Sequence, residues 1–476
     1  MTGTLSKVSS GISGLDEITG GGLPAGRSTL VIGGPGSGKT LLGATFLVRG
    51  ATQDNEPGIL VSFDERASDI IVNCRSLGFD LDGLQERQLL GIEHVLIERQ
   101  QLVEAGEYDL EGLFIRLELA IGSIGAKRVV LDSLDTLFAS IPNEAILRAE
   151  LRRLFGWLRE RELSTVITSE RAINERQLSR HGIEEYVSDC VILLDTRINE
   201  ELATRRLRVV KYRGTSHGNN EYPFIIGSAG VTVLPVTSLG LAHKVSEERV
   251  SSGILGLDAM LGAPGDGAEG YFKGSSVLIS GGPGAGKTSI AAQFAAAACS
   301  KGEKCLYFAF EESEPQLERN MRSIGMDLDP LLAKGLLEIH AIRPTLQSLE
   351  MHLATMMHKV RTMAPDVVVV DPLSALLSSG TAVQSKMMVL RLIDYIKSFG
   401  ATALYSVVYH DRDVVDLDVS SLMDTWIVLE NERRLDNLER LLYVVKSRGM
   451  SHSPDVRRFL ISDTGIEIKL KKEAAG

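Results

Sequence analysis

Short apolar runs alternate along the chain with segments in which apolar residues recur every three or four positions. Each run is three to five residues long and carries no charge. Such runs are typical of strands that are buried on both faces of a parallel sheet. In the first half of the chain they occupy residues 30–32, 59–63, 129–131 and 166–168.

The segments between such runs have the spacing of amphipathic helices. Two sets of four apolar residues each fall on one helical face: Leu147, Leu151, Leu154 and Leu158 in the first half, and Val389, Leu392, Ile393 and Ile396 in the second. Strand–helix alternation, with a glycine-rich loop after an early strand, predicts a doubly wound α/β fold. We therefore expect a mostly parallel sheet flanked by helices.

The chain repeats itself. Five blocks occur twice in the same order, which chance does not produce. They are SSGISGLDEI from residue 9 and SSGILGLDAM from 251, GGPGSGKT (33–40) and GGPGAGKT (281–288), FDE (63–65) and FEE (310–312), RVVLDSLDTL (128–137) and VVVVDPLSAL (367–376), and VVKYRGTSH (209–217) and VVKSRGMSH (444–452). We predict two tandem domains, 1–240 and 241–476, with a polar linker within 235–249. A glycine-rich insertion at 263–274 is expected to be an exposed loop.

Composition narrows the class of protein. The 476 residues include 51 basic and 62 acidic ones, and the net charge of −11 argues against passive wrapping by nucleic acid. Cys74, Cys190, Cys299 and Cys305 form no CxxC pair, so we expect buried, reduced thiols instead of a zinc site or a disulfide framework. No apolar run approaches the roughly 20 residues of a membrane span, and no signal core opens the chain. We expect a cytoplasmic protein.

Each copy contains the pattern GxxxxGK[ST] between an apolar strand and a helical segment. Glycines in such a loop let backbone N–H groups surround phosphate oxygens, aided by the helix N-terminus. Lys39 and Lys287 are expected to neutralise the β- and γ-phosphates, and Thr40 and Thr288 to ligate Mg²⁺. The predicted ATP-binding residues are Gly33, Gly34, Pro35, Gly36, Ser37, Gly38, Lys39, Thr40 and Leu41 in the first copy, and Gly281, Gly282, Pro283, Gly284, Ala285, Gly286, Lys287, Thr288 and Ser289 in the second.

Carboxylates follow two further strands in each copy. Asp132 and Asp371 end apolar strands, from which a carboxylate can reach the metal through water. An acidic pair follows the strand after each phosphate-loop helix, where it can polarise an attacking water or accept a hydroxyl proton. The candidate catalytic residues are Asp64, Glu65, Glu311 and Glu312 with the two loop lysines, Lys39 and Lys287. The candidate metal ligands are Thr40, Asp132, Thr288, Asp371 and Glu311.

A cationic motif recurs near the end of each copy, as KYRGTSH and KSRGMSH. We expect this segment on an edge strand, where lysine and arginine commonly serve only to prevent aggregation. Repetition of the whole motif favours arginine fingers that reach a neighbouring subunit's ATP, which can be worth on the order of 10³–10⁵ in rate. Such use requires a closed ring. The candidate finger and nucleotide-contact residues are Lys211, Tyr212, Arg213, Thr215, His217, Lys446, Ser447, Arg448 and His452.

Together these motifs resemble one family, the KaiC proteins, which are circadian-clock ATPases of the RecA-like group. The resemblance extends from about residue 9 to residue 468. Its most specific parts are the SSGIxGLD openings, the doubled phosphate loops, the doubled acidic pair and the two K-x-R-G-x-S-H motifs. It implies two RecA-like domains that bind ATP and Mg²⁺, assembled as a homohexameric double ring with ATP between subunits.

In that family the first domain is a slow ATPase and the second is an autokinase. The kinase phosphorylates a Ser/Thr pair on the adjacent subunit, with the first glutamate of its acidic pair as general base. That glutamate corresponds to Glu311, and the acceptor segment to residues 417–429, with Ser420 and Ser421 as the acceptors. Taken alone, two adjacent serines are typical of a helix cap or a surface turn. Their position before the DTWIVL strand is the reason for assigning these two serines as the phosphoacceptors.

Three features depart from the family pattern. The acceptor pair is Ser-Ser instead of Ser-Thr, so kinase chemistry is kept but an ordered two-step phosphorylation does not follow. Asp64 is one methylene shorter than glutamate, so either Asp64 or Glu65 can serve in the first copy. The chain ends soon after ISDTGIEIKLKKEAAG, where the clock protein has a longer tail that docks its activator, so no KaiA-like activator is expected. A KaiB-like partner would dock on the first domain, at residues 93–113.

Two other functions remain open. A DNA-directed motor or strand-exchange protein can use the same core, although the acidic charge and the lack of an added DNA-binding module count against it. A nucleotide-gated scaffold with little turnover is the other, and the intact lysine, threonine and acidic pair in both copies count against a dead site. The Met- and His-rich segment 351–363 is interpreted as a helix whose methionines fill a core, not as a metal site.

Overall fold

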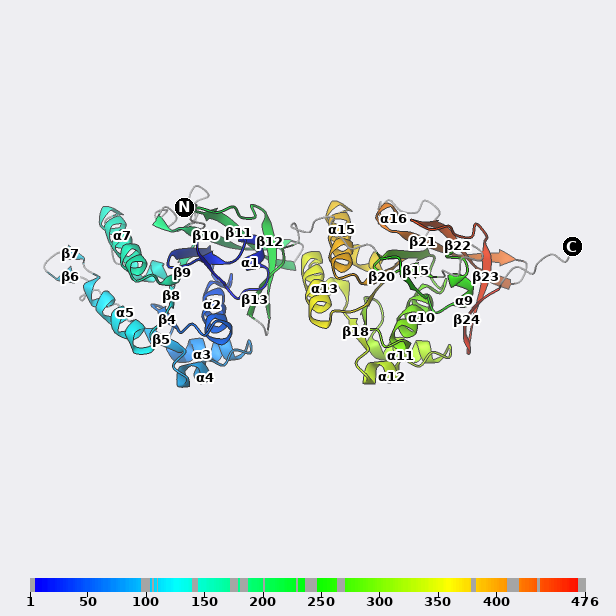
Figure 1. The fold of residues 1–476 in the computed structure, drawn as a ribbon, viewed down its shortest axis with the longest axis horizontal. Coiled ribbons are helices and arrows are strands. Elements are labelled where there is room, and N and C mark those ends of the chain that lie inside the picture. Colours follow the sequence, from blue (N-terminus) through cyan, green and yellow to red (C-terminus); the bar gives the residue numbers. More distant parts are fainter. Residues whose placement is uncertain are drawn as a thin grey trace. The chain divides into compact units, whose positions relative to one another are not determined.

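The computed structural model of the chain describes residues 5–95, 103–104, 107–108, 110–138, 144–171, 179, 187–199, 202–227, 230–235, 246–262, 270–377, 382–408, 419–434 and 437–469. The chain divides into two compact units, Met1–Ser238 and Leu239–Gly476. Each unit contains one nine-stranded sheet with helices packed against it (Figure 1). The predicted linker, 235–249, lies mostly outside the described residues.

The sheet of the first unit is parallel over most of its width. Strands β5, β4, β8, β9, β3 and β10 run parallel, and β11, β12 and β13 continue the sheet in antiparallel pairing. In spatial order the strands are β13 (Gly230–Val233), β12 (Glu221–Gly227), β11 (Leu202–Tyr212), β10 (Cys190–Asn199), β3 (Ser28–Gly33), β9 (Ser164–Glu170), β8 (Arg128–Asp132), β4 (Gly58–Ser62) and β5 (Leu90–His94).

The second unit has the same strand order and the same directions. Strands β18, β17, β19, β20, β16 and β21 run parallel. Strands β22, β23 and β24 complete the sheet in antiparallel pairing. In spatial order the strands are β18 (Leu337–Ala341), β17 (Cys305–Ala309), β19 (Val367–Asp371), β20 (Thr402–Val408), β16 (Ser276–Gly281), β21 (Thr425–Arg434), β22 (Asn437–Ser447), β23 (Arg457–Ser462) and β24 (Gly465–Ile468). The duplication therefore extends from sequence to topology.

Helices connect the strands in both units. The first unit has α1 (Leu15–Ile18), α2 (Lys39–Gln53), α3 (Ala67–Arg75), α4 (Leu81–Glu86), α5 (Glu111–Ile124), α6 (Leu134–Phe138) and α7 (Glu144–Glu160). The second has α9 (Leu255–Asp258), α10 (Lys287–Ser300), α11 (Glu314–Arg322), α12 (Asp329–Ala333), α13 (Leu349–Met363), α14 (Leu373–Leu377), α15 (Ala382–Ser398) and α16 (Val419–Leu422), with a 3₁₀ turn, η1, at Pro344–Leu346. Two-residue strands form small antiparallel pairs: β1 (Lys7–Val8) with β2 (Leu23–Pro24), β6 (Val103–Glu104) with β7 (Glu107–Tyr108), and β14 (Arg249–Val250) with β15 (Tyr271–Phe272).

Both faces of the first sheet are covered because successive strand residues point to opposite faces. In β3, Leu30 and Ile32 belong to an apolar cluster that includes side chains of α5 and α7. Val31, between them, belongs to a second cluster that includes side chains of α2, α3 and α4. The middle of the strand therefore needs consecutive apolar residues, and Leu30, Val31 and Ile32 supply them.

The predicted fold class, a mostly parallel α/β sheet flanked by helices, is confirmed. The four apolar runs of the first half lie in β3, β4, β8 and β9 and pair in parallel, with Phe63 just beyond the end of β4. The two predicted helical faces lie on α7 and α15, and all eight of their apolar side chains are buried. In α13, the side chains of Met356 and Met357 are also buried, as interpreted from sequence.

Two sequence expectations need correction. The K-x-R-G-x-S-H segments begin near the ends of β11 and β22, which are not edge strands of their sheets; the outer strands pair with them at residues 206–208 and 440–442, before the motifs begin. Residues 263–274 are not wholly an exposed loop, because Tyr271 is fully buried in β15 and packs edge-on against Phe294, 5.5 Å between ring centres. This two-residue strand is the counterpart of β2 in the first copy; residues 263–269 lie outside the described residues.

All four cysteines are buried and form no disulfide bond, as expected. Burial raises the pKa of Cys74 to about 11 and that of Cys190 to about 12, so neither thiol carries appreciable thiolate near neutral pH. Within the described part of the chain, no helix is both long enough and apolar enough to cross a membrane.

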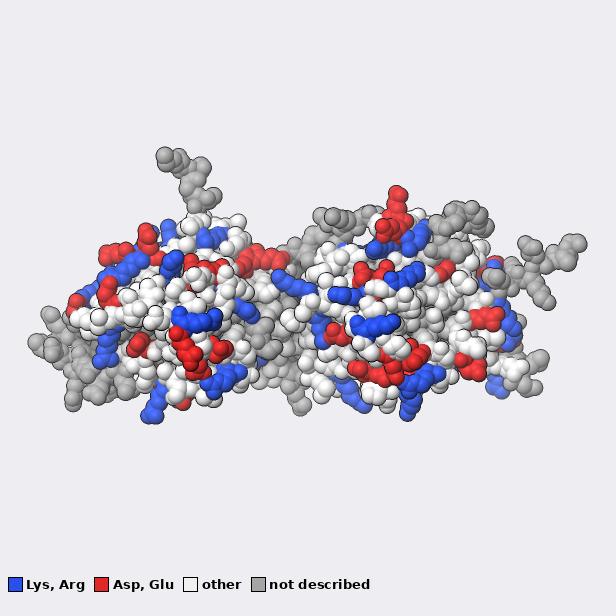
Figure 2. Space-filling model, turned by 60° about the horizontal axis from the view of Figure 1, so that its bottom comes forward, with Lys and Arg blue, Asp and Glu red and all other residues white. Residues whose placement is uncertain are grey.

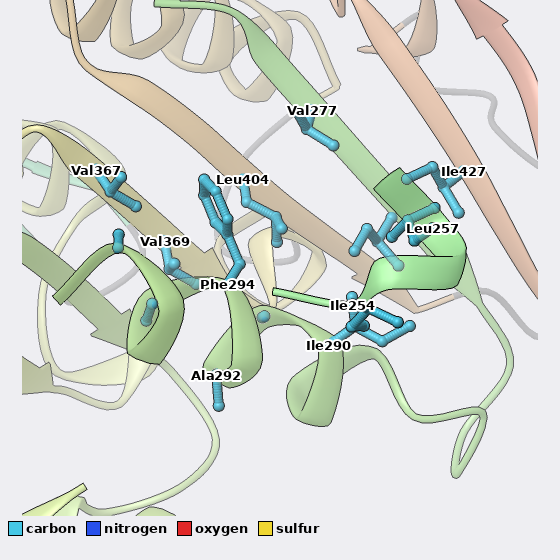
Figure 3. Close-up of a cluster of buried hydrophobic side chains, with 14 of the residues drawn as sticks. Ile254, Leu257, Val277, Ile290, Ala292, Phe294, Val367, Val369, Leu404 and Ile427 are labelled. Carbon is cyan, nitrogen blue, oxygen red and sulfur yellow. The ribbon is translucent and has the colours of Figure 1, made fainter. Parts of the chain in front are cut away.

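The core of the second unit forms between α10 and the sheet (Figure 3). Helix α10 contributes Ile290 and Phe294, while Val369 of β19 and Leu404 of β20 come from strands beneath it. All four side chains are fully shielded from solvent. Removing a large side chain here would leave a cavity that the packed strands cannot fill.

The first prediction concerns Phe294. Phe294→Ala should lower the free energy of unfolding of the second unit by about 3–5 kcal/mol, the usual cost of deleting a buried aromatic ring. Denaturant unfolding of the full chain measures this, followed by the fluorescence of Trp426 in a Trp157→Phe background. Leu255→Ala is the matched control, because Leu255 is 84% exposed in the same unit. A loss no larger than that of the control would contradict the packing described.

A second prediction concerns His352, which is 1% exposed in α13. Burial lowers its pKa below the ordinary value of about 6.5, although a hydrogen bond between its Nε2 and the Pro344 carbonyl at 2.9 Å opposes this. The unfolded chain therefore binds a proton that the folded His352 resists, and stability is lost as the pH falls through about 6.5, by at most about 1.4 kcal/mol per pH unit for this group.

His352→Gln cannot titrate and retains an amide N–H for the same carbonyl. The variant should show a smaller decrease in unfolding free energy between pH 7.5 and 5.5 than the parent protein, measured by urea titration. An equal decrease in both proteins would exclude the proposed contribution of His352.

Candidate functional site

In each unit, the predicted site residues meet at the carboxyl edge of the parallel sheet. In the first unit, the phosphate loop follows β3, the acidic pair follows β4, and Asp132 is the last residue of β8. Strand β9 lies between β3 and β8, and β4 lies beside β8. Because the strands are parallel and in register, their carboxyl ends lie along the same edge, which is where α/β folds bind ligands.

Each phosphate loop ends in a glycine at a position where a side chain would be strained. Gly38 and Gly286 cap α2 and α10 with φ angles of 97° and 100°, in the left-handed region. A Cβ on Gly38 would lie 2.9 Å from Cδ1 of Ile226. Neither helix has a capping side chain or an acidic residue in its first turn, so both N-termini suit an anion such as phosphate.

The two loop lysines fold back over their own loops. Lys39 Nζ donates to the carbonyl groups of Gly33 and Gly34 at 2.9 and 3.0 Å. Lys287 makes the same pair of bonds at 2.9 and 2.8 Å. Burial lowers the pKa of Lys287, while the carboxylates of Asp371 and Glu311 act in the opposite direction. A phosphate placed in the loop would offer this buried ammonium group a stronger partner.

The remaining loop residues lie where the sequence placed them. Thr40 and Leu41 belong to the first turn of α2, and Thr288 and Ser289 to that of α10. Ser37 is buried, and its hydroxyl group has no hydrogen-bond partner among the described residues. A buried donor of this kind at the phosphate loop fits an absent ligand oxygen.

Both strand-end aspartates are buried, but they have different partners. In the first copy, Asp132 accepts hydrogen bonds from Thr40 Oγ1, at 2.7 Å, and from the hydroxyl group of Thr168. In the second, Asp371 accepts from Tyr307 OH, at 2.7 Å, and from the hydroxyl group of Ser406. The structure thus joins the threonine and the aspartate of the predicted metal site directly in the first copy. Hydroxyl and carboxylate oxygens are the ligand types that Mg²⁺ takes beside nucleotide phosphates.

The acidic pairs occupy equivalent turns. The residue before each pair is tied to the next strand: Phe63 N donates to Asp132 O at 2.8 Å, and Phe310 N to Asp371 O at 2.9 Å. In both copies, the second acid is contacted by an asparagine of the following helix. The Asn73 amide lies 3.4 Å from Glu65 Oε2, and the Asn320 amide lies 3.2 Å from Glu312 Oε2.

A cavity of about 610 Å³ contains the second copy of the site. Lys287, Thr288, Glu311, Glu312 and Asp371 are among its lining residues. The structure therefore brings together the predicted phosphate, metal and catalytic residues of this copy in one open space. Helix α10 and the ends of β17 and β19 position them.

Arg440, which the sequence analysis missed, also lines this cavity. It projects from β22, and its Nε lies 3.4 Å from the Gly284 carbonyl of the phosphate loop. The signal was present in the repeat: Arg205 and Arg440 each precede the lysine of the K-x-R-G-x-S-H motif by six residues. A cation at this position would favour a phosphate group in the cavity.

The finger motifs lie at the opposite edge of each sheet from the phosphate loops, because β11 and β22 run antiparallel to the strands beside them. Lys211 and Lys446 are near the ends of β11 and β22, and the arginines follow directly. Tyr212 is buried and donates its hydroxyl proton to the Gly22 carbonyl at 2.9 Å, so its side chain serves its own domain. Thr215 accepts from Lys7 Nζ at 3.0 Å, and Ser447 bonds to Thr425 at 2.7 Å.

The two histidines of these motifs make equivalent contacts. His217 Nδ1 lies 3.1 Å from the carbonyl of Gly218, and His452 Nδ1 lies 3.3 Å from the carbonyl of Ser453. Burial and the neighbouring Arg448 lower the pKa of Lys446. No residue of either finger motif is among those that line the cavity of the second unit.

The predicted phosphoacceptors lie in the short helix α16. Ser420 is half-buried and Ser421 is exposed; residues 417 and 418 of the predicted acceptor segment are outside the described residues. Arg448 donates to the backbone carbonyl of Ser421 at 2.6 Å. The acceptor helix and the finger motif of the second copy are therefore in contact.

Comparison with known proteins agrees with this site. A family model described as "ATPase: KaiC" matches the chain twice, at residues 8–238 and 250–473. The chain is 51% identical over 470 residues to "Circadian clock protein KaiC2" of Synechocystis sp., covering 98% of this chain and 82% of that protein.

Two further relatives carry the description "Circadian clock oscillator protein KaiC". The protein of Synechococcus elongatus is 36% identical over 469 residues, covering 98% of this chain and 89% of its own. That of Parathermosynechococcus lividus is 36% identical over 467 residues, covering 97% and 85%. The resemblance inferred from the motifs is thereby confirmed. With a phosphate loop, a strand-end aspartate and an acidic pair in each half, the chain belongs to the KaiC family of ATPases and consists of two tandem KaiC domains.

Proposed function

We propose that this protein binds Mg²⁺·ATP in both domains, 1–240 and 241–476, and hydrolyses it, and that the second domain transfers phosphate to Ser420 and Ser421. The protein would act as a homohexamer and report its nucleotide and phosphorylation state to a protein partner. The observation that carries the proposal is the shared cavity of the second unit, where Glu311 faces the same space as Lys287, Thr288 and Asp371.

Phosphoryl transfer needs a loop and helix N-terminus for the phosphates, a cation, a metal site and a carboxylate to accept the hydroxyl proton. Lys287 and Arg440 supply positive charge, Thr288 and Asp371 supply oxygen ligands for Mg²⁺, and Glu311 supplies the carboxylate. Bound Mg²⁺ would neutralise charge that develops on the phosphate oxygens. Every group required is thus supplied by residues around one cavity.

The proposal assigns the transfer to a neighbouring subunit. Ser420 and Ser421 lie on α16 and are not among the residues that line the cavity of their own domain. An exposed acceptor such as Ser421 can instead be presented to the site of an adjacent protomer in a ring. The finger residues Lys446 and Arg448 would reach the neighbour's nucleotide from the same side, since Arg448 contacts the Ser421 carbonyl.

The partner is proposed from family membership. Two of the relatives compared above are described as circadian clock oscillator proteins. A KaiB-like partner would dock on the first domain at residues 93–113, a region that lies partly outside the described residues.

The DNA-directed alternative has little support on the described surface. Figure 2 shows basic and acidic side chains interspersed on the visible face of each unit, without a continuous basic area. The net charge of −11 points the same way. Binding of single-stranded DNA that weakens steeply with salt would nevertheless favour this function, and its absence would exclude it.

The third prediction tests the kinase. Incubation of the full-length protein with Mg²⁺·ATP should place phosphate on Ser420 or Ser421, and Glu311→Gln should reduce this by about 10² or more because the hydroxyl proton loses its acceptor. Mass analysis of the peptide spanning residues 417–429 measures it. An unmodified peptide despite ADP release would leave a plain ATPase, and no ADP release at all would favour the nucleotide-gated scaffold.

A fourth prediction tests the metal sites. Asp132→Asn should raise the Mg²⁺ concentration needed for ATP hydrolysis by the first domain about tenfold or more, because a neutral amide attracts the metal's bound water less strongly. The measurement is ADP release against Mg²⁺ in a Lys287→Ala background, where only the first site turns over. Asp82→Asn, at an exposed side chain of α4, is the control. Equal Mg²⁺ requirements for both variants would refute the assignment of Asp132.

A further inference from the structure

Three hydroxyl groups hold the acidic turn of the first copy in place. Ser62 Oγ accepts the backbone N–H of Glu65 at 2.9 Å. The hydroxyl groups of Ser133 and Thr136 donate to the two carboxylate oxygens of Asp64, at 3.1 and 2.5 Å. Ser62 ends β4, Ser133 follows β8, and Thr136 lies in α6. The turn is therefore fixed to three separate elements.

The second copy has the same turn without any of these hydroxyl groups. In the aligned repeat, the corresponding residues are Ala309, Pro372 and Ala375. None of the three can donate a hydrogen bond from its side chain. Among the described residues, no donor contacts the carboxylate of Glu311. All three differences between the copies thus act in one direction.

We propose that Ser62, Ser133 and Thr136 are positioning residues that fix Asp64 for attack by water. Their replacement in the second copy leaves Glu311 free to follow a serine hydroxyl group. This hydroxyl clamp, defined by the three residues, would divide the two reactions between the domains. The inference rests on the function proposed above, namely hydrolysis in the first domain and transfer to serine in the second.

The chemistry of the two acceptors explains why one base needs fixing and the other does not. In hydrolysis, the water oxygen bonds to the γ-phosphorus, the bond to the β–γ bridging oxygen breaks, and ADP leaves with that electron pair. The water proton passes to the carboxylate. Only the site itself orients a water molecule, so the base must be held rigid. A serine is instead delivered by its own helix, and a base with a longer, unclamped side chain can adjust to it.

The hydroxyl clamp also compensates for the short side chain of Asp64. An aspartate has one methylene fewer than glutamate, and so it reaches less far from the turn. Two hydroxyl donors on opposite carboxylate oxygens fix the direction of this short side chain, while each oxygen retains a lone pair for water. The asparagine contact to the second acid is common to both copies, and so it cannot account for a difference between them.

The test is Thr136→Val in the full-length protein with Lys287→Ala, so that ADP release reports the first site. Valine matches threonine in shape but lacks the hydroxyl donor. We expect kcat to fall about tenfold with KM within about twofold of the parent, because a misdirected base slows chemistry without weakening ATP binding. Thr136→Ser keeps the donor and should retain most of the parent's kcat. Autophosphorylation of Ser420 and Ser421, measured with Lys287 intact, should not change in Thr136→Val.

Each other outcome has one meaning. An unchanged kcat in Thr136→Val overturns the clamp. An equal loss of kcat in Thr136→Ser also overturns the clamp, and so does a loss of kcat in Thr136→Val that accompanies a lowered melting temperature. Either result would show that Thr136 has a packing role. Ser133→Ala is the second variant and should lower kcat in the same way. If Lys39→Ala leaves ADP release intact in the same background, the proposed function of the first site fails, and the clamp fails with it.

Discussion

Parallel pairing of β3, β9, β8 and β4 is the constraint on which the site of the first unit depends. Hydrogen bonding in register places the carboxyl ends of these strands side by side, so a loop, a buried aspartate and an acidic turn from distant parts of the sequence meet at one edge. Apolar residues in the middle of these strands point to both faces and hold the register, because both faces are covered by helices. The second sheet repeats this arrangement strand for strand.

The two cores keep the same register with different side chains. Arg128 begins β8, is fully buried and pairs with two acidic side chains, while Gly50 of α2 leaves room for its guanidinium group, since a Cβ there would lie 2.4 Å from Arg128 Nε. In the second unit, Val367 occupies that place, and its strand partner is Cys305. A buried charge that loses its partners is costly, so the arginine and its surroundings must change together. The fold tolerates the arginine in the first unit because Gly50 of α2 and the acidic residues that follow this helix accommodate its size and charge.

At the site, too, the two copies share a backbone arrangement but differ in side chains. Both copies tie the acidic turn to the next strand through equivalent backbone hydrogen bonds. Hydroxyl groups around the first acid, and the partners of the strand-end aspartate, differ between the copies. Gene duplication has thus preserved the backbone of the site while small side chains around it have diverged.

Much of this protein follows from local sequence. Glycines that allow a left-handed φ, with a lysine and a threonine at fixed spacing, specify the phosphate loops, and uncharged apolar runs specify the strands, because each depends on neighbouring residues. The duplication is visible by comparing the two halves of the sequence. Tertiary structure decided the rest. The sequence could not show that β11 and β22 are covered by further strands, that Tyr271 is buried, or that Arg440 reaches the phosphate loop. Nor could it show which hydroxyl groups meet Asp64. These contacts join residues that lie far apart in the chain, and only the packing of strands and helices brings them within hydrogen-bonding distance.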